Sequence, residues 1–196
     1  ELPAEFKNAV YMAALENKNL DFINEAVADT SFQVNVLNQL TKLSPLMVAA
    51  KNGDEHIVQA LLKKADISVK MVDESGLSAL EHAVKQGHRH TAEILINHEG
   101  EITKTYKFNQ KIFQQAINTN QEKIAMILLE KSGIESMPLS DLYTILFDTI
   151  NARQSFSEIV KGIIAQRPDI DINAKDQYGE SLILIAVKKN HKNIVK

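Results

Sequence analysis

The 196-residue sequence contains no cysteine and no tryptophan. Without cysteine the chain forms no disulfide, carries no catalytic thiol and offers no thiolate ligand to a metal. The absence fits a reducing compartment. We therefore expect the protein to be cytoplasmic, or to lie in the cytosol of a host cell if a bacterium secretes it.

Clustered positive charge and long hydrophobic runs are also absent. The chain has 22 basic against 25 acidic residues and a net charge of −3. Nucleic-acid binding relies on clustered cations that contact phosphates, so we expect no nucleic-acid partner. Apolar runs such as residues 182–187 are far shorter than the roughly 20 residues that cross a bilayer, so we expect no membrane span.

The sequence signatures of common enzymes are missing as well. There is no glycine-rich nucleotide loop, no nucleophile elbow and no zinc-protease motif. Two carboxylate pairs, Asp73 with Glu74 and Asp169 with Asp171, stand where we expect turns, in which aspartate stabilises the bend. Four histidines lie close together, but we interpret them as structural or solvent-exposed: His82, His88, His90 and His98. We expect no catalysis, no cofactor and no bound metal.

What the sequence does contain is a pattern of two short helices at residues 44–62. Ser44 can cap the first helix, and Pro45 suits its first position. Gly53 ends that helix, because glycine adopts a left-handed conformation without steric cost, and Asp54 and Glu55 open the next one. Helices this short are not stable alone in water, so the pair requires neighbours of its own kind.

The pattern recurs every 33 to 35 residues. The position of Ile57 in the second helix recurs at Phe22, Ile57, Thr91, Ile124, Ile159 and Ile194. The turn position recurs at Lys18, Gly53, Gly87, Asn120 and Asn190, and a small residue of the first helix at Ala14, Ala49, Ala83, Ala116 and Ala186. A repeat of this length with two helices predicts a stacked solenoid.

Short motifs within these repeats resemble those of ankyrin repeats. Residues 76–80 and 44–47 are similar to the G-x-T-P-L-H signature, and residues 73–76 and 176–179 to the D-x-x-G turn that precedes it. Residues 171–174 resemble the segment that joins ankyrin units. The resemblance implies an all-α solenoid of helix-turn-helix repeats with short inter-repeat turns. We expect one array of six units, at about 5–37, 38–72, 73–105, 106–137, 138–172 and 173–196, the last truncated.

Units four and five depart from the family pattern. Residues 111–114 and 140–143 replace the expected box. Unit five also has extra residues, which predict either a first helix that runs to about Ala152 or a longer connection at residues 153–157. The abundance of Lys, Asn and Ile is a hint of a host-associated bacterium.

The resemblance implies a non-catalytic protein-binding module that presents a concave groove. Leu77 and Tyr178 are the favoured contacts, since an apolar or aromatic residue at a turn tip suits an interface. Tyr106 and Phe108, which we place in the turn before unit four, form a second pair. The predicted partner-binding residues are Glu74, Ser75, Leu77, Lys85, Tyr106, Gln177, Tyr178, Glu180 and Lys188.

Two other functions stay open at this point. The chain could be the targeting or substrate-recognition part of a larger secreted effector or enzyme, with the catalytic domain elsewhere. It could instead be a structural scaffold that self-associates. We expect a monomer that binds a protein partner.

Overall fold

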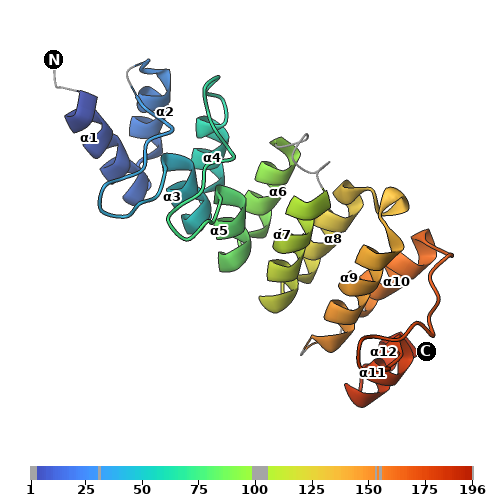
Figure 1. Cartoon of the computed structure of the whole chain (residues 1–196). Helices are drawn as coiled ribbons and strands as arrows, with labels where there is room; N and C mark the ends of the chain where they lie inside the picture. The colour runs from blue at the N-terminus through green and yellow to red at the C-terminus, as the bar shows by residue number, and fades with distance from the viewer. Residues whose placement is uncertain (1–3, 31, 99–105, 153, 155, 196) are drawn as a thin grey trace. The chain divides into compact units, whose positions relative to one another are not determined.

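The computed structural model describes the backbone of residues 4–30, 32–98, 106–152, 154 and 156–195, and the side chains of this set except for residues 4, 5 and 106–109. The chain divides into two compact units, Glu1–Gly100 and Glu101–Lys196. Each unit contains three helix pairs (Figure 1).

In the first unit, three helices stack in one row and their three partners in a second row. Helix α1 contacts α3 and α3 contacts α5, while α2 contacts α4 and α4 contacts α6. The six helices are α1 (Ala4–Glu16), α2 (Leu20–Ala28), α3 (Pro45–Asn52), α4 (Glu55–Leu61), α5 (Ala79–Gln86) and α6 (Arg89–His98).

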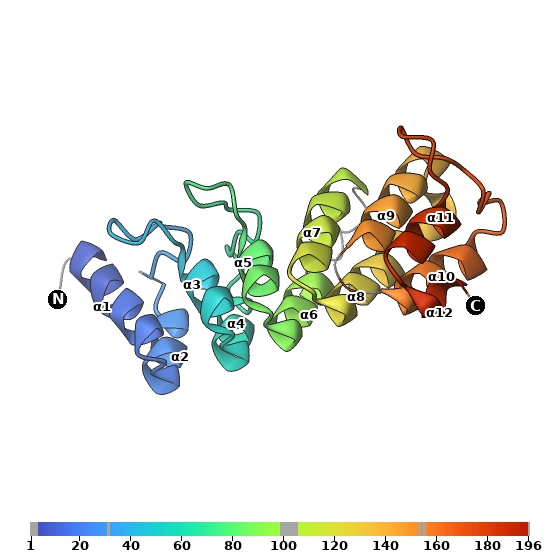
Figure 2. The ribbon, with the colours of Figure 1, turned by 90° about the horizontal axis from the view of Figure 1, so that it is seen from below.

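The second unit repeats this arrangement. Helices α7, α9 and α11 form one row, and α8, α10 and α12 form the other (Figure 2). Their bounds are α7 (Tyr106–Asn118), α8 (Glu122–Ser132), α9 (Leu139–Asn151), α10 (Ser157–Gln166), α11 (Leu182–Lys188) and α12 (Lys192–Val195), with a short 3₁₀ helix at Ile134–Ser136. The all-α prediction is confirmed for the described residues, which form no strand and only one isolated bridge, between Lys175 and Ser181. The predicted boundaries of the six repeats stay a prediction.

The predicted start and end of α3 are confirmed. The Ser44 hydroxyl accepts a hydrogen bond from the Met47 N–H at 3.3 Å, and Pro45 is the first helical residue. Gly53 ends the helix with a φ of 72°. The other members of the predicted turn position also have positive φ: Lys18 (55°), Gly87 (78°), Asn120 (60°) and Asn190 (60°).

Small and aliphatic side chains fill the space between the helical rows. The five alanines that recur in the first helices are all buried. Of the marker positions in the second helices, Phe22 and Ile194 are half-buried and the others are buried. A small residue at each crossing lets successive helices approach closely, which agrees with their dense stacking.

In both units, a cation that follows the second helix of a repeat donates to backbone carbonyls of the preceding repeat. Lys64 Nζ lies 2.8 Å from the carbonyl oxygen of Asp29 and 3.2 Å from that of Phe32. Arg167 Nη1 donates in the same way to Ile134 and Met137. The carbonyls of Asp29 and Ile134 also accept the backbone N–H groups of Phe32 and Met137, so each cation adds a further donor to carbonyls that follow a helix.

Two histidines make an equivalent link from the turn between paired helices. Nε2 of His88 lies 3.1 Å from the carbonyl oxygen of Lys51, at the end of α3. Nε2 of His191 lies 3.1 Å from the carbonyl oxygen of Ile150, near the end of α9. The interpretation of His88 as a structural residue is confirmed, and His191 makes the same contact in the last repeat.

The structure settles two points on the divergent repeats. Helix α9 ends at Asn151 and has 13 residues, against 8 in α3, and α10 begins only at Ser157. Both the helix and the connection are therefore longer. The placement of Tyr106 and Phe108 in a turn is wrong, because α7 begins at Tyr106. Residues 106–111 contain no Gly or Pro to delay a helix start.

Candidate functional site

The turn before α5 is organised by one carboxylate. Oδ1 of Asp73 accepts hydrogen bonds from the N–H groups of Ser75 (2.8 Å) and Leu77 (2.9 Å), and its backbone N–H donates to the Leu77 carbonyl at 3.0 Å. Oδ2 lies 2.9 Å from Nε2 of His82 on α5. The prediction that Asp73 stabilises a bend is confirmed, and the pairing with His82 was not foreseen.

Burial and hydrogen bonding act on Asp73 in opposite directions. Burial raises the pKa of this carboxyl, but the hydrogen bonds from Leu77, His82 and Ser75 outweigh burial and hold its pKa below the usual value. At the position of His82, the repeats of α3 and α11 have Val48 and Ile185. The buried pair is thus particular to this repeat.

The turn before α11 has the same construction without the histidine. Oδ1 of Asp176 accepts from the N–H groups of Tyr178 (2.8 Å) and Glu180 (2.9 Å). Tyr178 has 80% of its surface exposed, while Glu180 is half-buried and forms an ion pair with Lys188. The aromatic ring of Tyr178 is therefore held in solvent by a well-ordered turn.

The turn before α3 is one residue longer and presents an apolar tip. Oδ1 of Asn38 accepts from the N–H groups of Leu40 (2.8 Å) and Thr41 (3.0 Å). Lys42, with a φ of 56°, occupies the left-handed position that glycine fills in the other turns. Leu40 stands two residues after the acceptor, as Tyr178 does, and is 92% exposed. Leu40 was not predicted from sequence as a contact, although an apolar residue in a polar turn was the available signal.

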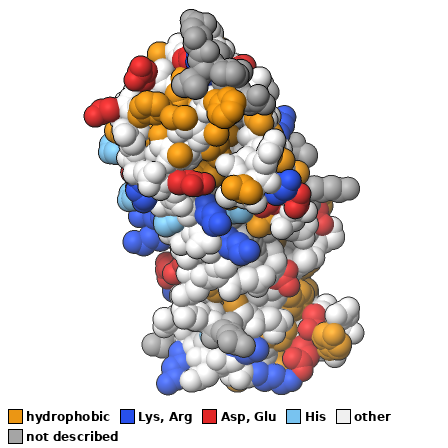
Figure 3. Space-filling model, turned by 90° about the vertical axis from the view of Figure 1, so that its left-hand side faces the viewer, with side chains coloured by type: hydrophobic (Ala, Val, Ile, Leu, Met, Phe, Trp, Pro, Cys, Tyr) orange, Lys and Arg blue, Asp and Glu red, His pale blue; other side chains and the backbone are white. Residues whose placement is uncertain are grey.

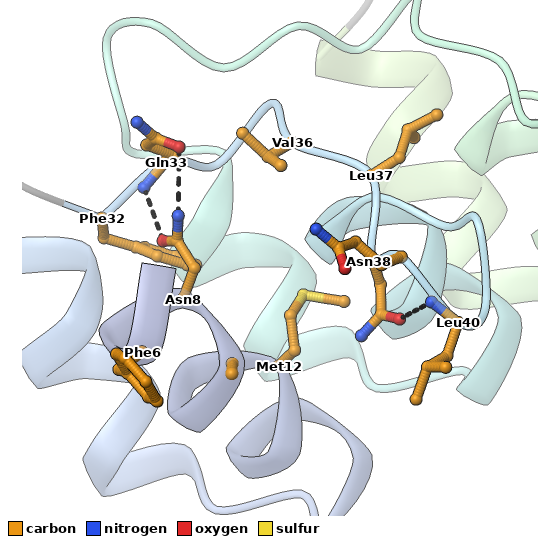
Figure 4. A pocket seen from close by; sticks show the side chains of 11 residues that line it. Phe6, Asn8, Met12, Phe32, Gln33, Val36, Leu37, Asn38 and Leu40 are labelled. Atoms are coloured by element: carbon orange, nitrogen blue, oxygen red, sulfur yellow. Dashed lines mark hydrogen bonds between the residues drawn. The ribbon is translucent and has the colours of Figure 1, made fainter. Parts of the chain in front are cut away.

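Leu40 borders an apolar groove of about 780 Å³ in the first unit (Figure 4). The groove lies between α1 and residues 32–40, the segment that follows α2. Among the residues whose side chains the structure describes, the lining contains seven apolar residues and four amides, and no charged residue: Phe6, Ala9, Met12, Phe32, Val36, Leu37 and Leu40, with Asn8, Gln33, Asn38 and Gln39.

The rims of the groove are exposed and its interior is buried. Met12 and Phe32 are buried, whereas Phe6 is 57% and Val36 45% exposed. Figure 3 shows hydrophobic side chains gathered on the face of the molecule at α1, with charged side chains at the border of the cluster. Large apolar side chains grouped in this way on a surface indicate an interaction site.

Two amides and one cation hold the wall of the groove in place. The Gln33 N–H donates to Asn8 Oδ1 at 3.2 Å, and Asn8 Nδ2 donates to Gln33 Oε1 at 3.1 Å (Figure 4). The Phe32 ring meets that of Tyr11 edge-on, with centroids 4.8 Å apart, and Lys64 Nζ lies 5.7 Å above it. The segment that forms the wall is thus fixed to α1 at one end.

The remaining predicted contacts fall in both units. Glu74 and Ser75 are exposed at the turn before α5, and Leu77 in the same turn is half-buried. Lys85 is exposed at the end of α5, and Gln177 at the turn before α11. For Tyr106 the structure describes only the backbone, in α7, so its side chain lies outside the described residues. No observation tests any of these residues as a contact, and they stay predictions.

The described residues offer no group of three or more His, Asp or Glu side chains that could hold a metal ion. Within that same part of the chain, no helix is both long and apolar enough to cross a membrane.

Comparison with known sequences places residues 10–106 within a family model of three ankyrin repeats. The ankyrin repeat domain-containing protein SAT10 of Stachybotrys chartarum is 28% identical over 169 aligned residues, covering 78% of this chain and 9% of that protein. A transient receptor potential cation channel subfamily A member 1 homolog of Caenorhabditis elegans is 26% identical over 148 residues, covering 76% of this chain and 12% of the channel. The chain therefore spans a small part of the length of each relative.

Solved structures share the fold across nearly the whole chain. EF0377, an ankyrin repeat protein, has a TM-score of 0.72 and 19% identity, covering 96% of this chain and 95% of its own. A chain from the complex of the predatory endopeptidase Bd0816 of Bdellovibrio bacteriovorus with the immunity protein Bd3460 has a TM-score of 0.65 and 22% identity, covering 94% of both. Identities this low establish the common fold.

Proposed function

Because the chain is an ankyrin repeat protein, we propose that it is a non-catalytic protein-binding module and that the groove beside α1 receives an apolar segment of the partner. The observation that carries this proposal is the exposure of Leu40 and Phe6, 92% and 57%, at the rims of a groove whose described lining residues carry no charge. A chain of the same fold occurs in the complex of an endopeptidase with its immunity protein, which agrees with a binding role.

Burial of these rims supplies the driving force for binding. Removing a large apolar side chain fully from water contributes roughly 1.5–3 kcal/mol. Leu40 and Phe6 are the most exposed apolar side chains of the lining, so they gain most when covered. In the free protein these two side chains contribute little to the free energy of folding, because they remain largely exposed to solvent.

Pre-organisation of the wall favours affinity. The Asn8–Gln33 amide pair already joins residues 32–40 to α1. Lys64, which follows α4, donates a hydrogen bond to the Phe32 carbonyl. A wall that is ordered before binding loses less conformational entropy when the partner arrives.

The lining also defines the chemistry of the partner. A charged side chain that entered the groove would lose water without gaining an opposite charge from the described lining residues, none of which is charged. The exposed Gln39 amide can instead bind backbone N–H and C=O groups. We therefore expect an uncharged segment with two or more large apolar side chains.

A peptide selection tests both the site and the chemistry. A library of random peptides displayed on phage is selected against the whole chain, and enriched peptides are measured for affinity by fluorescence anisotropy. We expect enrichment of apolar, uncharged peptides. Their affinity should fall at least tenfold, which corresponds to about 1.4 kcal/mol, in a Phe6→Ser, Leu40→Ser variant.

A control variant distinguishes binding in the groove from non-specific binding to exposed apolar side chains. Ile183 on α11 is 42% exposed and lies in the second unit, so Ile183→Ser removes an exposed apolar side chain outside the groove. The proposal fails if no peptide is enriched, or if Ile183→Ser weakens binding as much as the groove variant does.

Self-association is the competing occupant of the groove. Light scattering over a range of concentrations distinguishes it from binding of another protein. A wild-type mass that rises with concentration and stays monomeric in the Phe6→Ser, Leu40→Ser variant would assign the groove to a second copy and overturn the proposed partner.

A further inference from the structure

The second unit contains a polar hollow of about 500 Å³ between α7 and α9. It is distinct from the apolar groove in composition, because every residue of its lining is polar. The lining consists of Gln110, Lys111, Gln114, Gln115, Asn118 and Asp148.

Asp148 is the half-buried carboxylate of this hollow. It follows the buried Leu146 on α9 and precedes the buried Thr149 and Ile150. Among the described residues, no side chain or backbone group forms a hydrogen bond or ion pair with it. Burial alone raises the pKa of this carboxyl, whereas the pKa of Asp169 is lowered by the hydrogen bond from Arg167. Partial burial without a hydrogen-bond donor disfavours the ionised carboxylate. A ligand that supplies a donor removes this free-energy cost.

Amide side chains surround this carboxylate on the α7 side. Gln110, Gln114 and Asn118 follow one another at intervals of four residues, so they form a row along one face of the helix. Gln114 Nε2 donates to Asn118 Oδ1 at 3.3 Å. Gln110 and Gln114 line the same hollow as Asp148, so their side-chain oxygens can serve as neutral acceptors there.

We propose that this hollow binds the side chain of an arginine from a partner protein, with Asp148 as its counter-ion; the inference rests on the proposed protein-binding function. A guanidinium carries five N–H donors in a fixed plane, which suits one carboxylate flanked by several amide oxygens. A lysine ammonium matches this set less well, because it acts as a compact point charge.

Lys111 is the second charged residue of the lining and has the same sign as the proposed ligand. It is exposed, whereas Asp148 is half-buried. Charge in contact with solvent is screened more strongly than charge that is partly buried. The carboxylate therefore dominates the field inside the hollow, and Lys111 lies at its solvent side.

A titration with a small probe tests the hollow directly. N-acetyl-arginine amide is added to the ¹⁵N-labelled whole chain at millimolar concentrations, and side-chain amide resonances are followed by NMR. We expect saturable shifts for Gln110, Gln114, Gln115 and Asn118. N-acetyl-norleucine amide, which has a side chain of comparable length without charge, should give no saturable shift.

Substitution identifies the counter-ion. Asp148→Asn keeps the shape of the side chain and removes a partly desolvated charge, so the fold should persist, which the backbone spectrum verifies. We expect arginine binding to weaken at least fivefold. Asp141→Asn makes the same charge change on the same helix and should leave binding within twofold of wild type.

The inference is overturned if the arginine probe gives no saturable shift, or if Asp148→Asn binds it as tightly as wild type does. This outcome is independent of the peptide selection, which depends on residues of the first unit. If the peptide selection fails but the arginine titration is positive, the proposed role of the apolar groove is refuted and that of the hollow is retained.

Discussion

Nε2 of His82 lies 2.9 Å from Oδ2 of Asp73, and the two side chains are only 8% and 10% exposed. The other oxygen of Asp73 accepts the N–H groups of Ser75 and Leu77. One carboxylate therefore connects the turn before α5 to the helix itself. The turn tip, which carries the predicted contact Glu74, depends on this carboxylate for its shape.

Replacement of Asp73 should change how stability depends on pH. Its pKa in the folded protein lies below the usual value, because hydrogen bonds outweigh the effect of burial. The stabilisation is therefore complete above the unfolded pKa of about 3.9 and is lost as the pH falls through the folded pKa. The free energy of unfolding in urea, measured from pH 7 to pH 3, should fall less steeply for Asp73→Asn. The exposed Asp66 provides a control: Asp66→Asn should keep the wild-type slope, and equal slopes for all three would contradict the prediction.

Gly53→Ala should destabilise the protein more than Gly76→Ala. Both glycines have a φ of 72°, a conformation that costs an L-residue roughly 1–2 kcal/mol. At Gly53 an added Cβ would also lie 2.5 Å from Nδ1 of His88, whereas at Gly76 it would meet nothing within 4 Å. Displacing His88 loses its hydrogen bond to Lys51, so we expect an extra cost of about 1 kcal/mol. Urea denaturation measures both variants, and equal losses would show that His88 moves away freely.

Arg167→Gln should lower the urea midpoint of unfolding more than Asp169→Asn does. Arg167 donates to the carbonyls of Ile134 and Met137 and also to Asp169, which raises the pKa of the guanidinium through that hydrogen bond. Gln removes both carbonyl contacts, whereas Asp169→Asn removes only the exposed ion pair, and exposed pairs contribute little. A larger effect of the Asp169 variant would assign the stabilisation to the ion pair instead.

Leu77 and Tyr178, the two favoured contacts from sequence, should respond differently to truncation. Leu77 is half-buried, so Leu77→Ala should reduce the free energy of unfolding by about 1 kcal/mol. Tyr178 is 80% exposed, and Tyr178→Ala should change it by less than about 0.5 kcal/mol. Thermal and urea unfolding of the two variants decide the matter. A neutral Leu77→Ala would mean that this residue has no part in packing and is available for a partner.

The local features of the repeats could be predicted from sequence because neighbouring residues determine them. The Ser44 cap and the left-handed turn residues depend on a few positions, and each was found where expected. Leu40 was missed because its turn contains one more residue than the motif and uses Lys42 in place of glycine. The D-x-x-G motif that places Tyr178 in a turn therefore does not match the turn that contains Leu40.

Features that join distant residues could not be predicted in this way. The contact of Arg167 with Ile134 spans 33 residues, and the groove depends on Asn8 meeting Gln33, 25 residues away. The lack of a donor at Asp148 is likewise a property of the packed helices. A single sequence provides residue types at these positions but not their distances.

The backward contacts of Lys64 and Arg167 determine how the solenoid comes apart. Each cation belongs to one repeat and satisfies carbonyls of the repeat before it, across separations of 30 to 35 residues. When the later repeat melts, the carbonyls of the earlier repeat lose a charged donor. Such nearest-neighbour coupling makes unfolding cooperative in one dimension, so that disorder spreads along the stack instead of remaining within one repeat.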